Sequence, residues 1–284
     1  MMTEHEMFTM PAEELPKHSR VPFRIVPDVD TLYREMAEDI IEQIKRGNER
    51  GEPIKFIWPV GPIGQYPILV EAINRERISM KNVWIFMMDE YLDWQGRPIP
   101  EDHPLSFVGF MKRNFFELLD DDLKPPPEQI WFPHPFKVDE IDAKIEEIGG
   151  IDSCYGGVGI HGHIAFNESP VNRWYEVSAE EFKNSKTRVL QLAPETLVVN
   201  GIQAAGGNFE YIPPMAVTLG MKVILGARRI RLYLNRGLWQ RTILRRALLM
   251  EPTVCYPVTF VQEHPDALIT ADLDTAQPPL GKLV

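Results

Sequence analysis

Cysteine is scarce in this sequence, and its scarcity excludes two kinds of architecture. The chain has only two cysteines, Cys154 and Cys255. That number is too small for a disulfide framework or a cysteine-based metal site. Both residues lie in apolar segments, so we expect two free thiols that are buried in the core.

Long apolar runs and an excess of positive charge are also missing. The sequence has no stretch of about eighteen uninterrupted apolar residues, and its polar N-terminus lacks the basic-then-apolar order of a secretory signal. The net charge of −11 and the pI near 5.2 argue against nucleic acid and anionic membranes as partners. We therefore expect a cytoplasmic protein that acts on a small molecule, and homo-oligomerisation stays open.

The composition is that of an ordinary globular protein. At 284 residues, with 44% hydrophobic and 25% charged residues, the chain is long enough for one large core. Residues 1–20 are polar and interrupted by prolines, which predicts an N-terminal extension. We expect residues 21–284 to form a single domain.

Apolar runs typical of strands alternate along this domain with segments of helical periodicity. The predicted strands are 23–26, 55–60, 83–88, 130–132, 153–158, 188–192, 230–234, 255–261 and 267–270, and the predicted helices are 28–47, 66–75, 105–119, 138–148, 215–225 and 237–249. This alternation indicates a doubly wound α/β fold with a largely parallel sheet. Residues 169–187 show little regular apolar pattern, which predicts a lid over the site.

Residues 156–168, which read GGVGIHGHIAFNE, combine glycines with two histidines, an amide and a carboxylate. The glycines permit backbone turns and the close approach of a ligand. His163 is followed five residues later by Glu168. In such a pair the carboxylate fixes the tautomer of the ring and the ring moves a proton, so we predict general acid/base catalysis by these two residues.

Two further sites are predicted at the ends of buried strands. The strand at 83–88 is followed by Asp89 and Glu90, where open α/β sheets bind their ligands. Because side chains alternate along a strand, we expect only one of the two carboxylates to face the site. The turn between the strand at 55–60 and the next helix reads GPIG. Its amides are candidates for binding an anion at a helix N-terminus, through Gly61, Gly64 and Gln65, and a plain turn is the alternative.

The same segment also contains a spacing that is typical of a metal site. His161, His163 and Glu168 have the HxH-x4-E spacing of cupin metal sites, and Asp89 could complete a ligand set for zinc or iron. Cupins are β-barrels, however, whereas this motif lies among glycines in an α/β chain. We therefore predict no metal. A serine or cysteine nucleophile is not expected either, because the chain has no GxSxG motif.

Four motifs in one register give the chain a specific resemblance. They are MMDEYL at 87–92, HPLSFVGFMKRNFF at 103–116, the central segment at 156–168 and SKTRV at 185–189. Together they resemble the glucosamine-6-phosphate isomerase/deaminase family, a relative of the 6-phosphogluconolactonases. The resemblance implies a Rossmann-like three-layer fold and conversion of an amino-sugar phosphate to a ketose phosphate with loss of ammonia. It implies no organic cofactor.

The resemblance also implies roles for individual residues. Asp89 matches the aspartate that transfers a proton between two sugar carbons, His163 the histidine that opens the sugar ring, and Glu168 the glutamate that supports it. His161 is a further catalytic candidate beside them. The remaining candidates for substrate contact are Glu90, Gly162, Asn167 and Arg188, the last of which matches an arginine that the family uses in an effector site.

The departures from the family pattern concern charge and phosphate. His161 stands where many members have an aspartate or asparagine, and the GPIG turn lacks the hydroxyls of the family's phosphate loop. The phosphate-holding arginine and lysine align approximately with Ile202 and with Trp239 or Gln240. The resemblance therefore predicts that a terminal phosphate contributes little to binding, unless basic neighbours compensate, namely Arg236, Arg241, Lys183 and Lys186. A lactonase or isomerase for a sugar without a terminal phosphate, and a catalytically silent sugar-sensing domain, remain open alternatives.

Overall fold

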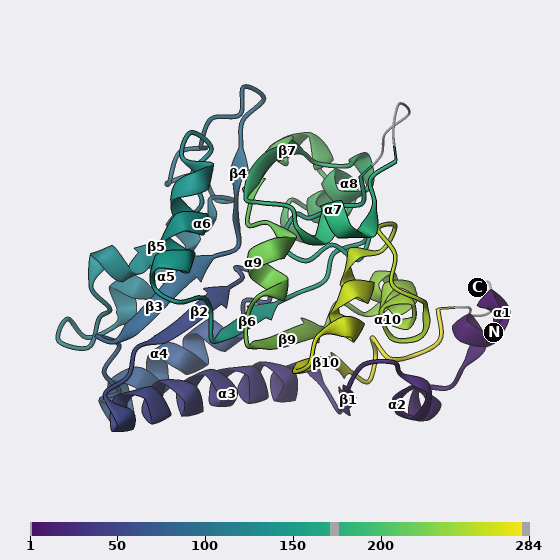
Figure 1. The fold of residues 1–284 in the computed structure, drawn as a ribbon, viewed down its shortest axis with the longest axis horizontal. Coiled ribbons are helices and arrows are strands. Elements are labelled where there is room, and N and C mark those ends of the chain that lie inside the picture. Colours follow the sequence, from purple (N-terminus) through teal and green to yellow (C-terminus); the bar gives the residue numbers. More distant parts are fainter. Residues whose placement is uncertain (1, 171–175, 280–284) are drawn as a thin grey trace.

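The computed structural model describes residues 2–170 and 176–279 and is built on a seven-stranded sheet (Figure 1). The strand order is β1-β10-β9-β6-β2-β3-β5, and each neighbouring pair runs parallel. The strands are β1 (Phe23–Val26), β2 (Ile54–Trp58), β3 (Val83–Met87), β5 (Ile130–Trp131), β6 (Ser153–Gly156), β9 (Arg229–Leu234) and β10 (Ala267–Asp272). The predicted α/β class and parallel sheet are thus confirmed.

Helices cover both faces of this sheet and complete a three-layer fold. Along β2, Phe56 and Trp58 pack into one hydrophobic cluster, whereas Ile57 between them packs into the other. This alternation follows from the two-residue period of a strand. The first cluster includes side chains of α3 (Val29–Arg50), α4 (Gln65–Glu76) and α5 (Phe107–Asn114), and the second includes side chains of α6 (Val138–Glu147), α9 (Met221–Leu225) and α10 (Gln240–Leu249).

Helix α3 shows how local sequence sets these elements. Its first turn is capped by Asp28, whose carboxylate accepts a hydrogen bond from the Thr31 amide at 2.7 Å. It ends at Gly51, which has a φ of 66° that glycine adopts without strain. The helix is therefore longer than predicted, because Gly47 is packed inside it against Ile54 rather than ending it.

A second, three-stranded sheet lies on the side of the central sheet opposite α3 in the view of Figure 1. Its antiparallel order is β4 (Asp89–Leu92), β8 (Met215–Thr218) and β7 (Arg188–Gln191). The chain passes from β3 through Met88 straight into β4. Asp89 therefore stands at the junction between the two sheets.

The predicted helix at 215–225 is wrong in its first half. Residues 215–218 form β8, since they are paired on both sides by β4 and β7. Only Met221–Leu225 is helical. Gly220 lies between this strand and the helix, and a Cβ there would come 2.1 Å from the Ser185 carbonyl oxygen, so the close packing at this position requires glycine. The helix α8 (Pro194–Ala204) that follows β7 was not predicted.

The predicted strand at 255–261 is also wrong. Residues Pro257–Glu263 form the 3-10 helix η6. Proline cannot donate to a ladder, and β9 already has β6 and β10 as neighbours. As a result Cys255 is exposed, which contradicts its predicted burial, whereas Cys154 lies in the core as predicted.

Residues near the N-terminus pack against the last helix. The helices α1 (Glu4–Thr9) and α2 (Leu15–His18) contact α10, and Met7 and Leu15 are buried in the same cluster as α10. Of the predicted lid, residues 171–175 lie outside the described residues. The described remainder contains α7 (Ala179–Lys183). Among the described residues, no helix is both long and apolar enough to cross a bilayer.

Candidate active site

A cavity of about 420 Å³ opens at the carboxyl ends of the central strands. It is lined by the turn after β2, the β3–β4 junction, the loop after β6, the start of α5, the helix α8 and the segment between β9 and α10. Carboxyl ends of parallel strands at such a point are where open α/β folds bind ligands. The cavity is large enough for a small molecule.

Asp89 lines this cavity and Glu90 does not, as the alternation along the strand predicts. The Glu90 carboxylate turns to the start of α5, where it accepts hydrogen bonds from the amides of Phe107 and Val108 and from the Ser106 hydroxyl. Asp89 is only 8% exposed. Burial, with a smaller contribution from the charge of Glu90, raises its pKa to about 8. A carboxylate in this setting is a stronger base than an exposed one.

His163 reaches the cavity because the loop after β6 folds back on itself. The Gly159 amide donates to the His163 carbonyl at 3.0 Å, and the imidazole lies on Gly159, where an added Cβ would come within 1.7 Å of Nε2. This close approach requires glycine. Beyond the histidine, Ala165 also lines the cavity with a φ of 54°, a left-handed conformation that is uncommon for alanine and recurs at functional sites.

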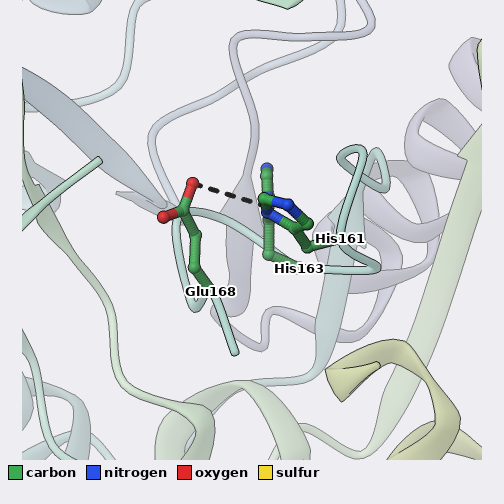
Figure 2. A group of neighbouring side chains, drawn as sticks. All are labelled: His161, His163 and Glu168. Carbon is green, nitrogen blue, oxygen red and sulfur yellow. Dashed lines mark ion pairs between the residues drawn. The ribbon is translucent and has the colours of Figure 1, made fainter. Parts of the chain in front are cut away.

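Glu168 and His161 lie beside His163 (Figure 2). The Glu168 Oε1 atom is 3.9 Å from His163 Nδ1, and Glu168 Oε2 accepts a hydrogen bond from the Ala193 amide at 2.7 Å. Burial raises the pKa of Glu168. Burial also lowers the pKa of His163 to about 3, with a smaller contribution from His161. The His163 ring is therefore neutral at physiological pH and can both give and take a proton.

The other residues predicted to bind substrate divide into two groups. Gly61 lines the cavity, but Gly64 is covered by the Tyr33 ring, which an added Cβ would meet at 2.1 Å. Gln65 is buried and donates to the Pro62 carbonyl. Neither Gly64 nor Gln65 is among the residues that line the cavity.

The loop that carries His163 is held, on the side away from the cavity, by Gly162, Asn167 and Arg188. Gly162 has a φ of 73° and packs against Ile243 and Val258. The Asn167 amide donates to the Leu219 carbonyl, and its oxygen accepts from Arg188 Nη1 at 2.8 Å. These three residues hold the histidine loop against β8 and α10 and do not line the cavity.

The sequence reasoning missed an aromatic wall of the cavity. The rings of Tyr91, Phe107 and Phe166 pack together with centroids 4.8 to 6.2 Å apart. The Tyr91 hydroxyl accepts a hydrogen bond from Asn200 on the unpredicted α8, and Asn200 also lines the cavity. Pro194 with an acid after it is a helix-start signal that could have revealed α8.

The four basic residues named as possible phosphate ligands differ in position. Only Arg236 lines the cavity. Arg241 pairs with Asp274, Lys183 pairs with Glu263, and Lys186 lies 4.0 Å from Asp139. Of the residues aligned with family phosphate ligands, Trp239 and Gln240 line the cavity and Ile202 does not.

Solved structures show which proteins share this fold. A monomeric glucosamine-6-phosphate deaminase aligns with 22% identity and a TM-score of 0.76, covering 90% of this chain and 99% of that one. A 6-phosphogluconolactonase from Trypanosoma cruzi aligns with 16% identity and a TM-score of 0.63, covering 90% and 96% of the two chains. The fold is that of sugar-phosphate deaminases and lactonases.

Sequence relatives decide the family. A curated protein from Porphyromonas gingivalis strain W83, named glucosamine-6-phosphate deaminase, is 32% identical to this chain over 87% of this chain and 90% of the relative. The relative of that name in Caenorhabditis elegans is 30% identical over 88% and 89% of the two chains. No protein-family model matches the sequence. The chain belongs to the glucosamine-6-phosphate deaminase family and is an enzyme of the isomerase/deaminase type in carbohydrate metabolism.

Proposed function

We propose that the protein catalyses aldose–ketose isomerisation of a sugar or amino-sugar derivative, with release of ammonia where the substrate carries an amine at C2. The observation that carries this proposal is the presence of Asp89 and His163 in one cavity. One is a carboxylate whose pKa is raised to about 8, and the other is an imidazole kept neutral by burial. The names of the relatives support an amino-sugar phosphate as the substrate class.

The two residues suit consecutive proton transfers. His163 moves the proton of the anomeric hydroxyl to the ring oxygen, which opens the ring. Asp89 then takes the proton from C2 and returns one to C1, while a proton of the C2 amine passes to the C1 oxygen, so that the amine becomes a ketimine and C1 an alcohol. Water adds to this ketimine and ammonia leaves, which gives the ketone. The Asp89 pKa near 8 brings its basicity close to the working pH, where general bases are most effective.

Glu168 acts through His163 in this proposal. Its carboxylate lies on the Nδ1 side of the ring and can orient the imidazole so that Nε2 exchanges protons with the substrate. The aromatic wall of Tyr91, Phe107 and Phe166 keeps bulk water away from the reacting carbons. Exclusion of water also strengthens the electrostatic interactions inside the cavity.

The proposal is tested by following the proton itself. Two sugars, glucosamine 6-phosphate and glucosamine, and a sugar lactone are each incubated with the protein in D₂O. NMR records deuterium uptake at the C1 and C2 positions and opening of the lactone, while a coupled assay records ammonia. We expect deuterium uptake and ketose formation with at least one of the two sugars. Hydrolysis of a sugar lactone without deuterium uptake would instead establish the lactonase alternative. Binding of a sugar without any turnover would establish the sensing alternative.

A further inference from the structure

His163 lies close to two other side chains that carry metal-binding atoms. Each of His161, His163 and Glu168 offers one ligand atom, and these atoms all lie within 4.8 Å of one another (Figure 2). Among residues 2–170 and 176–279, no other group of three histidine, cysteine or acidic residues meets this condition. His161 and Glu168 do not line the substrate cavity, so the cluster is a separate feature on the far side of the His163 ring.

The atoms that face one another in this cluster have no partners. The side chains of His163 and Glu168 are 7% and 9% exposed, and His163 Nδ1 and Glu168 Oε1 are buried without a hydrogen bond. The other carboxylate oxygen of Glu168 is paired with the Ala193 amide. A buried polar atom without a partner costs about 1–3 kcal/mol, and native proteins hold few of them. Two such atoms that face each other indicate a place where a ligand would bind to both.

The separation of these atoms leaves room for an ion. At 3.9 Å, His163 Nδ1 and Glu168 Oε1 are too far apart for a direct hydrogen bond. Two ligands of a tetrahedral zinc ion, each about 2.0–2.2 Å from the metal, lie roughly 3.3–3.5 Å apart. To bind a metal, the 3.9 Å pair would close by about half an ångström and the widest pair, at up to 4.8 Å, by about 1.5 Å, without a change of fold.

We propose that His161, His163 and Glu168 bind one divalent first-row transition metal ion, of which Zn²⁺ is the representative. Two imidazoles and one carboxylate are the donor set that these ions prefer. The set supplies three protein ligands and leaves one position of a tetrahedral ion open. His161, whose side chain is 28% exposed, gives the ion a path from solvent.

A carboxylate beside the cluster fits the same assignment. Glu195 Oε2 lies 3.7 Å from His161 Nε2, and metal-bound histidines commonly have a carboxylate near the ring that sets its orientation. The spacing of these residues in the sequence did not favour a metal, because the motif lies outside a β-barrel. In the structure the turn between Gly159 and His163 brings the two imidazoles together, so that no barrel is needed.

An ion at this position would determine which nitrogen of His163 carries the ring proton. Since Nδ1 faces the cluster, a metal bound there leaves the ring proton on Nε2, the nitrogen that lies on Gly159 beside the cavity. The residues would then present a fixed proton donor to the substrate side. The metal assignment does not depend on the proposed reaction, because it is tested by binding alone.

The test uses the full-length chain, free of any affinity tag and stripped with a chelator. Isothermal titration calorimetry with Zn²⁺ should show one saturable site per chain, and Co²⁺ should give a visible d–d spectrum of low symmetry. His161→Gln and Glu168→Gln should each weaken Zn²⁺ binding by at least about tenfold, because loss of even an outer-shell partner typically costs 10–100-fold. His134→Gln, at an exposed histidine outside the cluster, is the matched control and should bind like the unmodified chain.

Circular dichroism of each variant checks that it is folded, and the Co²⁺ spectrum of the unmodified chain supports or refutes the site without any substitution. A single site that survives in both cluster variants would overturn the proposal, as would the absence of saturable binding in the unmodified chain. The second result would mean that an ordered water alone bridges His163 and Glu168.

Discussion

At the scale of single residues, the proposed chemistry depends most on the burial of Asp89. Its carboxylate stands where β3 runs into β4 and is 8% exposed in the cavity wall. Its neighbour Glu90 is held away by the amides at the start of α5. Adjacent carboxylates thus have different environments, and only the one that faces the cavity is available as a base.

Replacement of Asp89 by asparagine should remove this base without a change of shape. We expect Asp89→Asn to lower kcat by about 10²–10⁴-fold, the usual contribution of a general base. Substrate binding, measured by calorimetry, and the thermal unfolding temperature should remain near those of the unmodified protein. Turnover close to normal in Asp89→Asn would show that another group takes the C2 proton.

The raised pKa of Asp89 also predicts a pH dependence. The base form of a carboxyl group exists above its pKa, so kcat/KM should fall as the pH drops below about 8, by roughly tenfold per pH unit. Glu90→Gln removes a neighbouring negative charge that contributes to this pKa, and the fall should then begin at a lower pH. A profile that stays flat down to pH values near 4, where an exposed carboxyl group titrates, would contradict this assignment.

At the scale of elements, two segments determine how strongly the cavity binds a phosphate. They are the turn between β2 and α4 and the segment between β9 and α10. Pro62 and Ile63 of the first and Trp239 of the second line the cavity and offer no charge. Arg236 is the cationic side chain there, and it is exposed. This composition supports the sequence-based prediction that a terminal phosphate contributes little.

A matched pair of substrates tests that prediction. We expect kcat/KM for a phosphorylated sugar to exceed that for the same sugar without phosphate by less than about tenfold, since each lost charge-assisted hydrogen bond is worth about 1.5–3 kcal/mol. Arg236→Gln should reduce whatever preference remains. A preference of a hundredfold or more that persists in Arg236→Gln would mean that other groups bind the phosphate.

Helix α10 holds together segments that are distant in sequence, through one buried arginine. Arg245 is fully buried and donates hydrogen bonds to the carbonyls of Met10, Ala276 and Gln277. Arg245→Met leaves these carbonyls without donors, and we expect it to lower the free energy of unfolding by about 2–4 kcal/mol. Denaturation by urea measures this loss.

The matched control for Arg245 is Arg75, whose ion pairs with Glu71 and Glu76 lie on the surface of α4. Exposed ion pairs contribute little to stability because solvent screens them, so Arg75→Met should change the free energy of unfolding little. Equal losses in the two variants would refute the role given to Arg245.

At the scale of the whole molecule, the packing of the core predicts how the two thiols react. Cys154 lies fully buried in β6, and burial raises its pKa, whereas Cys255 is exposed beside η6. Ellman's reagent should therefore modify one thiol per chain in the native protein and two after unfolding. Two fast-reacting thiols in the native state would show that the core opens around β6, and fewer than two after unfolding would show a disulfide.

Local patterns in the sequence were sufficient for most of the architecture and for the two central catalytic candidates. The runs at 83–88, before Asp89, and at 153–158, before the glycine-rich loop of His163, predicted buried strands, because a strand between two helical layers must be apolar on both faces. The carboxyl ends of such strands meet at one edge of the sheet. For this reason Asp89 and His163 could be expected in one cleft.

Tertiary contacts decided what the local patterns left ambiguous. The segment at 215–218 became a strand because β4 and β7 lie on both sides of it. The segment at 255–261 did not, because Pro257 cannot donate to a ladder and β9 is already paired on both sides by β6 and β10. Arg188 and Asn167 turned toward each other rather than toward the cavity. The approach of His161 to His163 and Glu168 depends on the turn between Gly159 and His163, and this loop packs on β8 and α10. Pairing partners and loop packing are long-range properties, and short-range periodicity carries no information about them.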